Sequence, residues 1–181
     1  AQLVWNKEAA FALSKISITP KELQTLVETA QLYQIHEKNP TLSELKKIEA
    51  EYQEVLDSFQ KFKNSDEFAN LVEQTNTEEL SSKIKELRTK LQEVRVRNDD
   101  VIQTIANANL IIEWVIKART IQKLHEQGKR LNYQSLKEIL HMGSLCKIPS
   151  DNKLFLFIRN LLDSLSAVMD QYNKYKKSQS E

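Results

Sequence analysis

The sequence predicts an all-α protein, an elongated helical bundle in which a long central helix or a helical hairpin joins two similar helical repeats. Only two Gly and three Pro occur among 181 residues, whereas average proteins contain about 7% Gly and about 5% Pro. Such a scarcity of turn residues indicates few turns and therefore long helices. Apolar residues also recur at three- and four-residue intervals, and helix-capping motifs recur along the chain. These observations argue against β-sandwiches and Gly-rich nucleotide-binding folds.

The first predicted repeat spans residues 1–62 and begins with a helix that carries Trp5. Residues 19–22 combine a capping Thr, a Pro at the first helical position and a Glu three residues after the cap, so a second helix should start near residue 20. Asn39-Pro40 breaks the chain, because the residue before a proline is disfavoured in helical geometry. The capping spacing at residues 41–44 then predicts the start of a longer third helix.

Residues 63–107 form the predicted central connector. No Pro or Gly occurs between residues 77 and 125, and apolar residues follow an alternating four-three spacing that is typical of a coiled coil. The candidate interaction seam consists of Leu80, Ile84, Leu87, Leu91 and Val94. Two alternatives stay open here: one continuous helix over 77–125, or a second helix that residues 98–100 (Asn-Asp-Asp) cap.

The second predicted repeat spans residues 108–175, and a polar tail follows at 176–181. Shifting the sequence by 113 positions superimposes twelve apolar pairs, which include Leu23 with Leu136 and Phe59 with Tyr172. Trp5 falls on Trp114 with a shift of 109, so four extra residues lie in a loop around Gly128. Residues 135–138 repeat the capping spacing, and Gly128 and Gly143 are predicted helix ends or turns. The structural anchors of the two repeats are Trp5, Leu23, Leu26, Pro40, Trp114, Leu136, Ile139 and Pro149.

Residue chemistry points to no catalytic, cofactor-binding or metal-binding site. The three histidines have no helical metal-pair spacing, and one cysteine cannot form a Cys-x-x-Cys site. Walker, dinucleotide and nucleophile-elbow motifs are absent from the sequence. Cys146 is interpreted as a small, buried apolar residue, with a reactive thiol as the alternative, and a single cysteine fits a reducing compartment. We expect a fragment that is not an enzyme and that needs no cofactor.

Charge gives little reason to expect a polyanion partner. The chain has 26 Lys plus Arg and 25 Asp plus Glu, with a formal net charge of +1. Basic runs within 88–97 and 174–177 allow at most weak contact with a DNA backbone. No stretch of about 18 uncharged apolar residues predicts a membrane span, and the charged start of the sequence predicts no signal peptide. A first residue that is Ala rather than Met suggests a piece of a larger protein.

The repeated unit resembles the PLU-type helical region of JARID-type Jumonji histone lysine demethylases and their catalytically degenerate relatives. The resemblance rests on the Trp-led helix at 114–124, on residues 131–140, on Lys147-Ile148-Pro149 and the long helix after them, and on the similar first copy through Phe59. It covers residues 1–62 and 108–175, whereas 63–107 match only as generic helix. The iron-binding, zinc-binding and histone-reading residues of such proteins have no counterpart in this sequence.

The resemblance implies a nuclear, non-catalytic scaffold that spaces the domains of a chromatin-modifying protein or docks subunits of a histone-modifying complex. The expected partners are those subunits or other domains of the parent chain, with no membrane contact. A cytoskeletal or tethering coiled-coil protein of spectrin-like type is the alternative, because the seam fits that class equally well. Self-association through the seam is a further alternative. The parent is either an active demethylase or an inactive relative.

Overall fold

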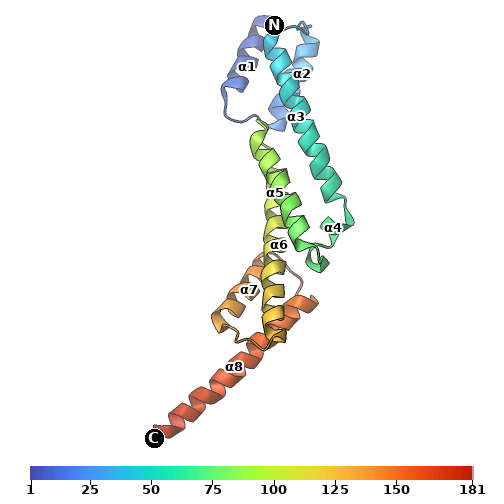
Figure 1. Cartoon of the computed structure of the whole chain (residues 1–181). Helices are drawn as coiled ribbons and strands as arrows, with labels where there is room; N and C mark the ends of the chain where they lie inside the picture. The colour runs from blue at the N-terminus through green and yellow to red at the C-terminus, as the bar shows by residue number, and fades with distance from the viewer. Residues whose placement is uncertain (181) are drawn as a thin grey trace. The chain divides into compact units, whose positions relative to one another are not determined.

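A computed structural model describes residues 1–180, and within them the chain forms α-helices and one short 3-10 helix, with no β-sheet (Figure 1). The all-α prediction is confirmed. The helices are α1 (Gln2–Ser14), α2 (Pro20–Leu32), α3 (Pro40–Lys63), α4 (Asp66–Ala69), η1 (Leu71–Glu73), α5 (Thr77–Glu93), α6 (Asp99–Glu126), α7 (Tyr133–Leu145) and α8 (Lys153–Gln179). The chain divides into two compact units: unit 1 comprises Ala1–Asn70 and Ser82–Ala106, and unit 2 comprises Leu71–Ser81 and the chain from Asn107 onward.

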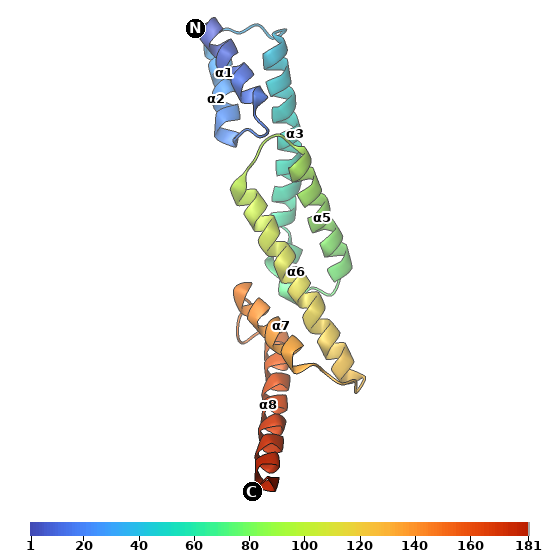
Figure 2. The ribbon, with the colours of Figure 1, turned by 90° about the vertical axis from the view of Figure 1, so that its left-hand side faces the viewer.

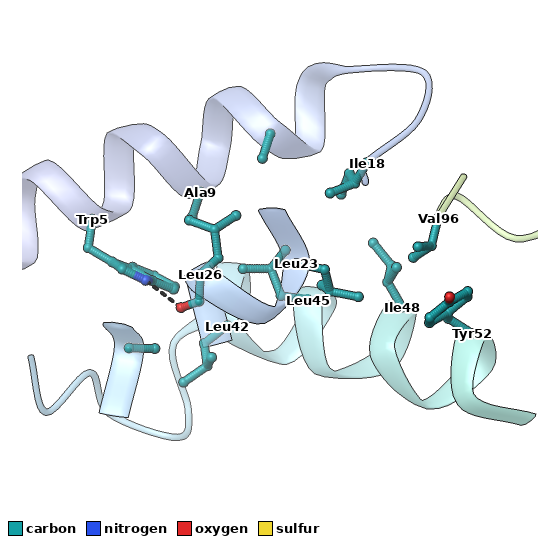
Figure 3. Packing of buried hydrophobic residues seen from close by; sticks show 12 residues of the cluster. Trp5, Ala9, Ile18, Leu23, Leu26, Leu42, Leu45, Ile48, Tyr52 and Val96 are labelled. Carbon is teal, nitrogen blue, oxygen red and sulfur yellow. Dashed lines mark hydrogen bonds between the residues drawn. The ribbon is translucent and has the colours of Figure 1, made fainter. Parts of the chain in front are cut away.

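Unit 1 is built around α3. Helices α1 and α2 pack against each other and against the first half of α3 (Figures 1 and 2). The second half of α3 lies beside residues 82–93 of α5 in both views. The Trp5 ring is fully buried, and its indole N–H donates a 2.9 Å hydrogen bond to the Leu26 carbonyl (Figure 3). The other buried members of the core of unit 1 are Ala9, Ala12, Ile18, Leu23, Leu26, Ala30, Leu42, Leu45, Ile48, Tyr52 and Val96.

Unit 2 has its own apolar core, which α6, α7 and α8 build. Helix α7 packs along α8. The Trp114 ring is fully buried, and its indole N–H donates a 2.9 Å hydrogen bond to the Ile139 carbonyl. It also stacks on Phe155, with ring centroids 6.2 Å apart. The other buried members of this core are Val115, Ala118, Ile121, Leu136, Ile139, Ile148 and Ile158.

Asparagine side chains, rather than the predicted Thr and Ser, cap two of the helices. The capping box of Thr19 and Glu22 at the start of α2 is present as predicted. Helix α3, however, begins after Asn39, and α7 begins after Asn132, so the predicted caps at Thr41 and Ser135 are wrong. In both cases one side-chain oxygen of the Asn accepts hydrogen bonds from two backbone amides of the first turn. Asn is among the residues most strongly preferred at the N-cap, which explains why α3 and α7 begin directly after Asn39 and Asn132.

The continuous helix over 77–125 is wrong, because the chain breaks between α5 and α6. The side-chain oxygen of Asn98 caps α6 by accepting a 3.3 Å hydrogen bond from the Val101 amide. Before it, the Ile18 amide donates to the Arg95 carbonyl at 2.8 Å, and the Arg97 amide donates to the Ile18 carbonyl at 2.9 Å. These bonds form an isolated parallel bridge between Ile18 and Val96, which is 1% exposed. Burial of Val96 and the bridge together offset the helical hydrogen bonds that the break removes.

The two glycines have different roles. Gly128 follows α6 with φ +67°, which agrees with the predicted turn because glycine adopts this left-handed geometry readily. Gly143 lies inside α7, so its predicted role as a helix end is wrong. A Cβ atom built on Gly143 would lie 2.6 Å from the indole nitrogen of Trp114 and 3.1 Å from the Phe155 ring. Glycine is needed there because the Trp114 ring passes close to the α7 backbone.

Replacing Gly143 with alanine should therefore destabilise unit 2 by about 1 to 3 kcal/mol. Alanine favours a helix over glycine by about 1 kcal/mol, but the buried Trp114 ring has no room to move away from a new methyl group. Urea unfolding followed by Trp fluorescence measures the change. A Gly143→Ala variant more stable than the wild type would contradict this packing.

A few backbone features recur 113 positions apart in the segments α2–α3 and α7–α8. Helices α2 and α7 both have 13 residues and begin 113 positions apart. Helices α3 and α8 also begin 113 positions apart. The residues after the ends of α2 and α7, Gln34 and Lys147, have positive φ angles of 51° and 58°. The next amide, of Ile35 or Ile148, donates a 2.9 Å hydrogen bond back into the helix in both cases. This is the hydrogen bonding of a Schellman-type helix end.

Candidate protein-interaction surface

The histidines are exposed and lie on different elements. The ring nitrogen Nδ1 of His36 accepts a 3.0 Å hydrogen bond from the Lys38 amide in the turn before α3. His125 makes an edge contact with Phe157 at 5.6 Å between ring centroids, and His141 lies on the outside of α7. Across residues 1–180, no group of three or more His, Cys, Asp or Glu side chains is arranged to hold a metal ion.

Cys146 is a half-buried free thiol immediately after α7. Burial raises its pKa above the ordinary value for a thiol, and the negative charge of Glu113 raises the pKa further. Because the thiolate is the nucleophile, a raised pKa lowers reactivity at neutral pH. The environment is therefore that of a packing residue, and it does not activate a nucleophile.

We expect iodoacetamide to alkylate Cys146 more slowly at pH 7.5 than it alkylates a free cysteine in a model peptide. The rate should rise as the pH increases beyond the ordinary thiol range, because the thiolate forms only there. Mass spectrometry of samples quenched over time measures it. The Glu113→Gln variant should react faster than the wild type, and a Cys146 that reacts as fast as the model peptide would contradict the environment described here.

The predicted anchors lie in the two cores or at helix starts. Trp5, Leu23 and Leu26 belong to the core of unit 1, and Trp114, Leu136 and Ile139 belong to the core of unit 2. Pro40 is the exposed first residue of α3, and Pro149 is exposed in the turn before α8. These residues have structural roles and do not form a binding surface.

The seam from Leu80 to Val94 is not exposed to a partner. Leu80 and Ile84 are fully buried, Leu87 and Leu91 are at most 8% exposed, and Val94 is partly buried. Within unit 1, Leu87 lines a shallow cleft with Phe62, and Val94 lines another with Val55. The seam residues of unit 1 thus cover α3 instead of presenting an interaction surface.

The basic run in residues 88–97 is largely neutralised by neighbouring groups. Lys90 pairs with Glu86 at 2.8 Å, and Arg97 pairs with Asp99 at 2.8 Å. The guanidinium group of Arg95 donates hydrogen bonds to the carbonyls of Leu13 and Lys15. Its distance to the Glu44 carboxylate is 3.8 Å. Arg95 thus ties the segment between α5 and α6 to the end of α1, and Lys90 and Arg97 each have a carboxylate beside them.

The second half of α8 carries an apolar surface that sequence reasoning missed. Val168 and Tyr172 are 61% and 63% exposed, and Met169 and Tyr175 are 46% and 62% exposed. We call the set Leu161, Leu165, Val168, Met169, Tyr172 and Tyr175 the α8 stripe. All described residues from 167 onward are exposed. A contiguous exposed apolar surface is typical of a protein-interaction site.

A groove of about 940 Å³ lies at the start of the α8 stripe. Leu131 from the α6–α7 loop and Leu161 and Leu165 from α8 form its apolar wall. Lys129 and Arg130 also line the groove. The groove and the α8 stripe therefore make one continuous apolar surface with basic residues beside it.

The chain matches no protein-family model, no curated protein and no solved structure. Within the described residues, none of the helices combines the length and apolar character that crossing a membrane requires.

Proposed function

We propose that the chain is a non-catalytic helical scaffold of a nuclear, chromatin-modifying protein of histone demethylase-like type. On this proposal it spaces domains of its parent protein or docks subunits of a histone-modifying complex. The single observation that carries the scaffold role is the exposed α8 stripe, since Val168 and Tyr172 are more than half exposed while Val55 and Phe59, 113 positions earlier, are buried. The chromatin assignment rests on the resemblance to the PLU-type region.

The proposed mechanism is geometric. Two apolar cores, each fixed by a tryptophan that donates a hydrogen bond to a backbone carbonyl, hold short helices in place. Such a fixed framework presents a binding surface without the loss of entropy that ordering a flexible chain would cost. The α8 stripe is the part of this framework that a partner would cover.

The rival spectrin-like class has three long helices in each unit. Here α2 and α7 have only 13 residues each, and a proline follows each of them: Pro40 is the first residue of α3, and Pro149 lies in the turn before α8. This organisation favours the PLU-type interpretation over the spectrin-like one.

The test compares proteins that the tagged chain captures from a nuclear extract at moderate salt. Tyr172→Asp places a charge on the α8 stripe, and Leu145→Asp is the matched control because Leu145 is also exposed, at 70%, but lies at the end of α7. We expect the wild type and Leu145→Asp to recover subunits of a histone-modifying complex and Tyr172→Asp to lose them. Recovery of cytoskeletal or vesicle-tethering proteins instead, or equal recovery by all three, would contradict the proposal.

A further inference from the structure

We propose that the α8 stripe and its groove bind an amphipathic helix of a partner protein, antiparallel to α8 and followed by an extended segment with a β-branched residue next to Leu131. This inference rests on the proposed function in assuming a protein partner, and it specifies the partner's structure. The argument comes from unit 1, where the chain itself supplies such an occupant.

In unit 1, α5 covers the second half of α3. Val55, Phe59 and Phe62 of α3 are at most 8% exposed. Phe62 lines a cleft with Leu87, and Val55, two helical turns earlier, lines a cleft with Val94. The contacts thus run in opposite directions along the two helices, which are antiparallel (Figures 1 and 2).

The segment after α5 completes this covering. Val96 packs among Ile18, Ile48 and Tyr52 (Figure 3). The backbone hydrogen bonds that Arg95 and Arg97 make with Ile18 form the parallel bridge and hold Val96 in this position. The side-chain amide of Asn98 donates a 2.9 Å hydrogen bond to the Tyr52 hydroxyl. A helix followed by an extended β-branched residue is therefore the structure that this surface accepts.

The matching surface of unit 2 is open. The residues 113 positions after Ile18, Ile48 and Tyr52 are Leu131, Leu161 and Leu165, and all three line the groove. Beyond the groove, the counterparts of the buried residues of α3 are the exposed members of the α8 stripe: Val168 for Val55, Met169 for Leu56, Tyr172 for Phe59 and Tyr175 for Phe62. Unit 2 thus has the apolar pattern that α5 and Val96 cover in unit 1, and none of its described segments lies over it.

Charge indicates how the occupant differs from the α5 segment. In unit 1 the guanidinium group of Arg95, in the segment after α5, lies 3.8 Å from the Glu44 carboxylate. The residue 113 positions after Glu44 is Phe157, which carries no charge. Lys129 and Arg130 line the groove instead, and Lys174, Lys176 and Lys177 follow near the end of α8. The occupant therefore carries carboxylates beside its extended apolar residue, since like charges across an interface are unfavourable.

The probe is a synthetic peptide with the sequence of residues 78–99 in which Arg95→Glu and Arg97→Glu are introduced. It is titrated into the full chain, and NMR follows the Leu131 amide, the Val168 methyl groups and, as an internal control, the Val55 methyl groups. The covalently attached α5 should keep the peptide out of unit 1, because its effective concentration is far higher. We expect saturable shifts at Leu131 and Val168 and none at Val55.

Three comparisons make the result specific. A Val96→Asp peptide and a Tyr172→Asp chain should each weaken binding at least tenfold, whereas a Leu145→Asp chain should bind as the wild type does. The peptide that keeps both arginines should bind more weakly than the glutamate form. The inference would be overturned if Leu131 showed no shift up to millimolar peptide, or if the Val96→Asp peptide bound equally well. It would also be overturned if signals of the α8 stripe shifted with protein concentration in the absence of peptide, because that would indicate a second copy of the chain as the occupant.

The two proposals can fail separately. If the capture depends on Tyr172 but the peptide does not bind, the scaffold proposal stands and the inferred occupant is wrong. If the peptide binds as expected but no chromatin-modifying subunit is captured, the inferred occupant stands and the chromatin assignment is wrong.

Discussion

Replacing Trp114 with alanine is expected to lower the free energy of unfolding of unit 2 by about 3 to 5 kcal/mol. The ring is fully buried, stacks on Phe155 and is the donor to the Ile139 carbonyl. Truncation would leave a large cavity and remove the indole hydrogen bond to the Ile139 carbonyl, and both effects are destabilising. Urea unfolding monitored by circular dichroism measures the loss.

Trp5→Ala is the matched variant, since Trp5 is equally buried and makes the corresponding bond to Leu26 in unit 1. We expect a loss of similar size there. Trp114→Phe keeps most of the ring and removes only the N–H donor, so it should cost less than Trp114→Ala. A change below about 1 kcal/mol for either alanine variant would show that the ring does not anchor its core.

Replacing Val55 with aspartate should destabilise unit 1 by about 3 kcal/mol or more, whereas Val168→Asp should change stability by no more than about 0.5 kcal/mol. The two valines occupy positions 113 residues apart on α3 and α8, but Val55 is 7% exposed and Val168 is 61% exposed. A buried carboxylate loses its hydration, and an exposed one keeps it. Urea unfolding of both variants gives the comparison.

The pair of variants isolates burial as the cause, because the same side chain is exchanged for the same charge in a long helix. Equal destabilisation by the two substitutions would mean that another segment covers the α8 stripe in the free protein. A neutral Val55→Asp would mean that α5 does not cover α3. Either result would remove the basis for a docking surface on α8.

The sequence predicted the helices well where local signals are strong. The capping box at Thr19 and Glu22 placed the start of α2 correctly, because two side chains satisfy backbone amides within one turn. The caps at Asn39 and Asn132 are not predicted, because the Thr/Ser-x-x-Glu motifs a few residues later have the spacing of the capping box at Thr19 and Glu22. Sequence alone does not decide between a continuous helix and a break before α6, because the break depends on Ile18, which is far away in the sequence.

Exposure could not be predicted from the pattern of apolar residues. Val55 and Val168 both have an apolar or aromatic residue three positions before and four positions after them, so a periodicity argument gives both the same interior role. The difference arises only from tertiary structure, because α5 lies along α3 in unit 1. Gly143 is a similar case, since its role depends on how closely the Trp114 ring approaches α7.

The central claim is that the second half of α8 lacks the covering that the second half of α3 has. Hydrogen–deuterium exchange of the full chain tests it directly, since amides of a helix that packs on one face exchange through larger opening events than those of an uncovered helix. We predict that amides in 165–175 exchange at least about a hundredfold faster than those in 52–62, and that the residue 78–99 probe peptide slows them. Equal protection of the two segments in the free chain would contradict the account.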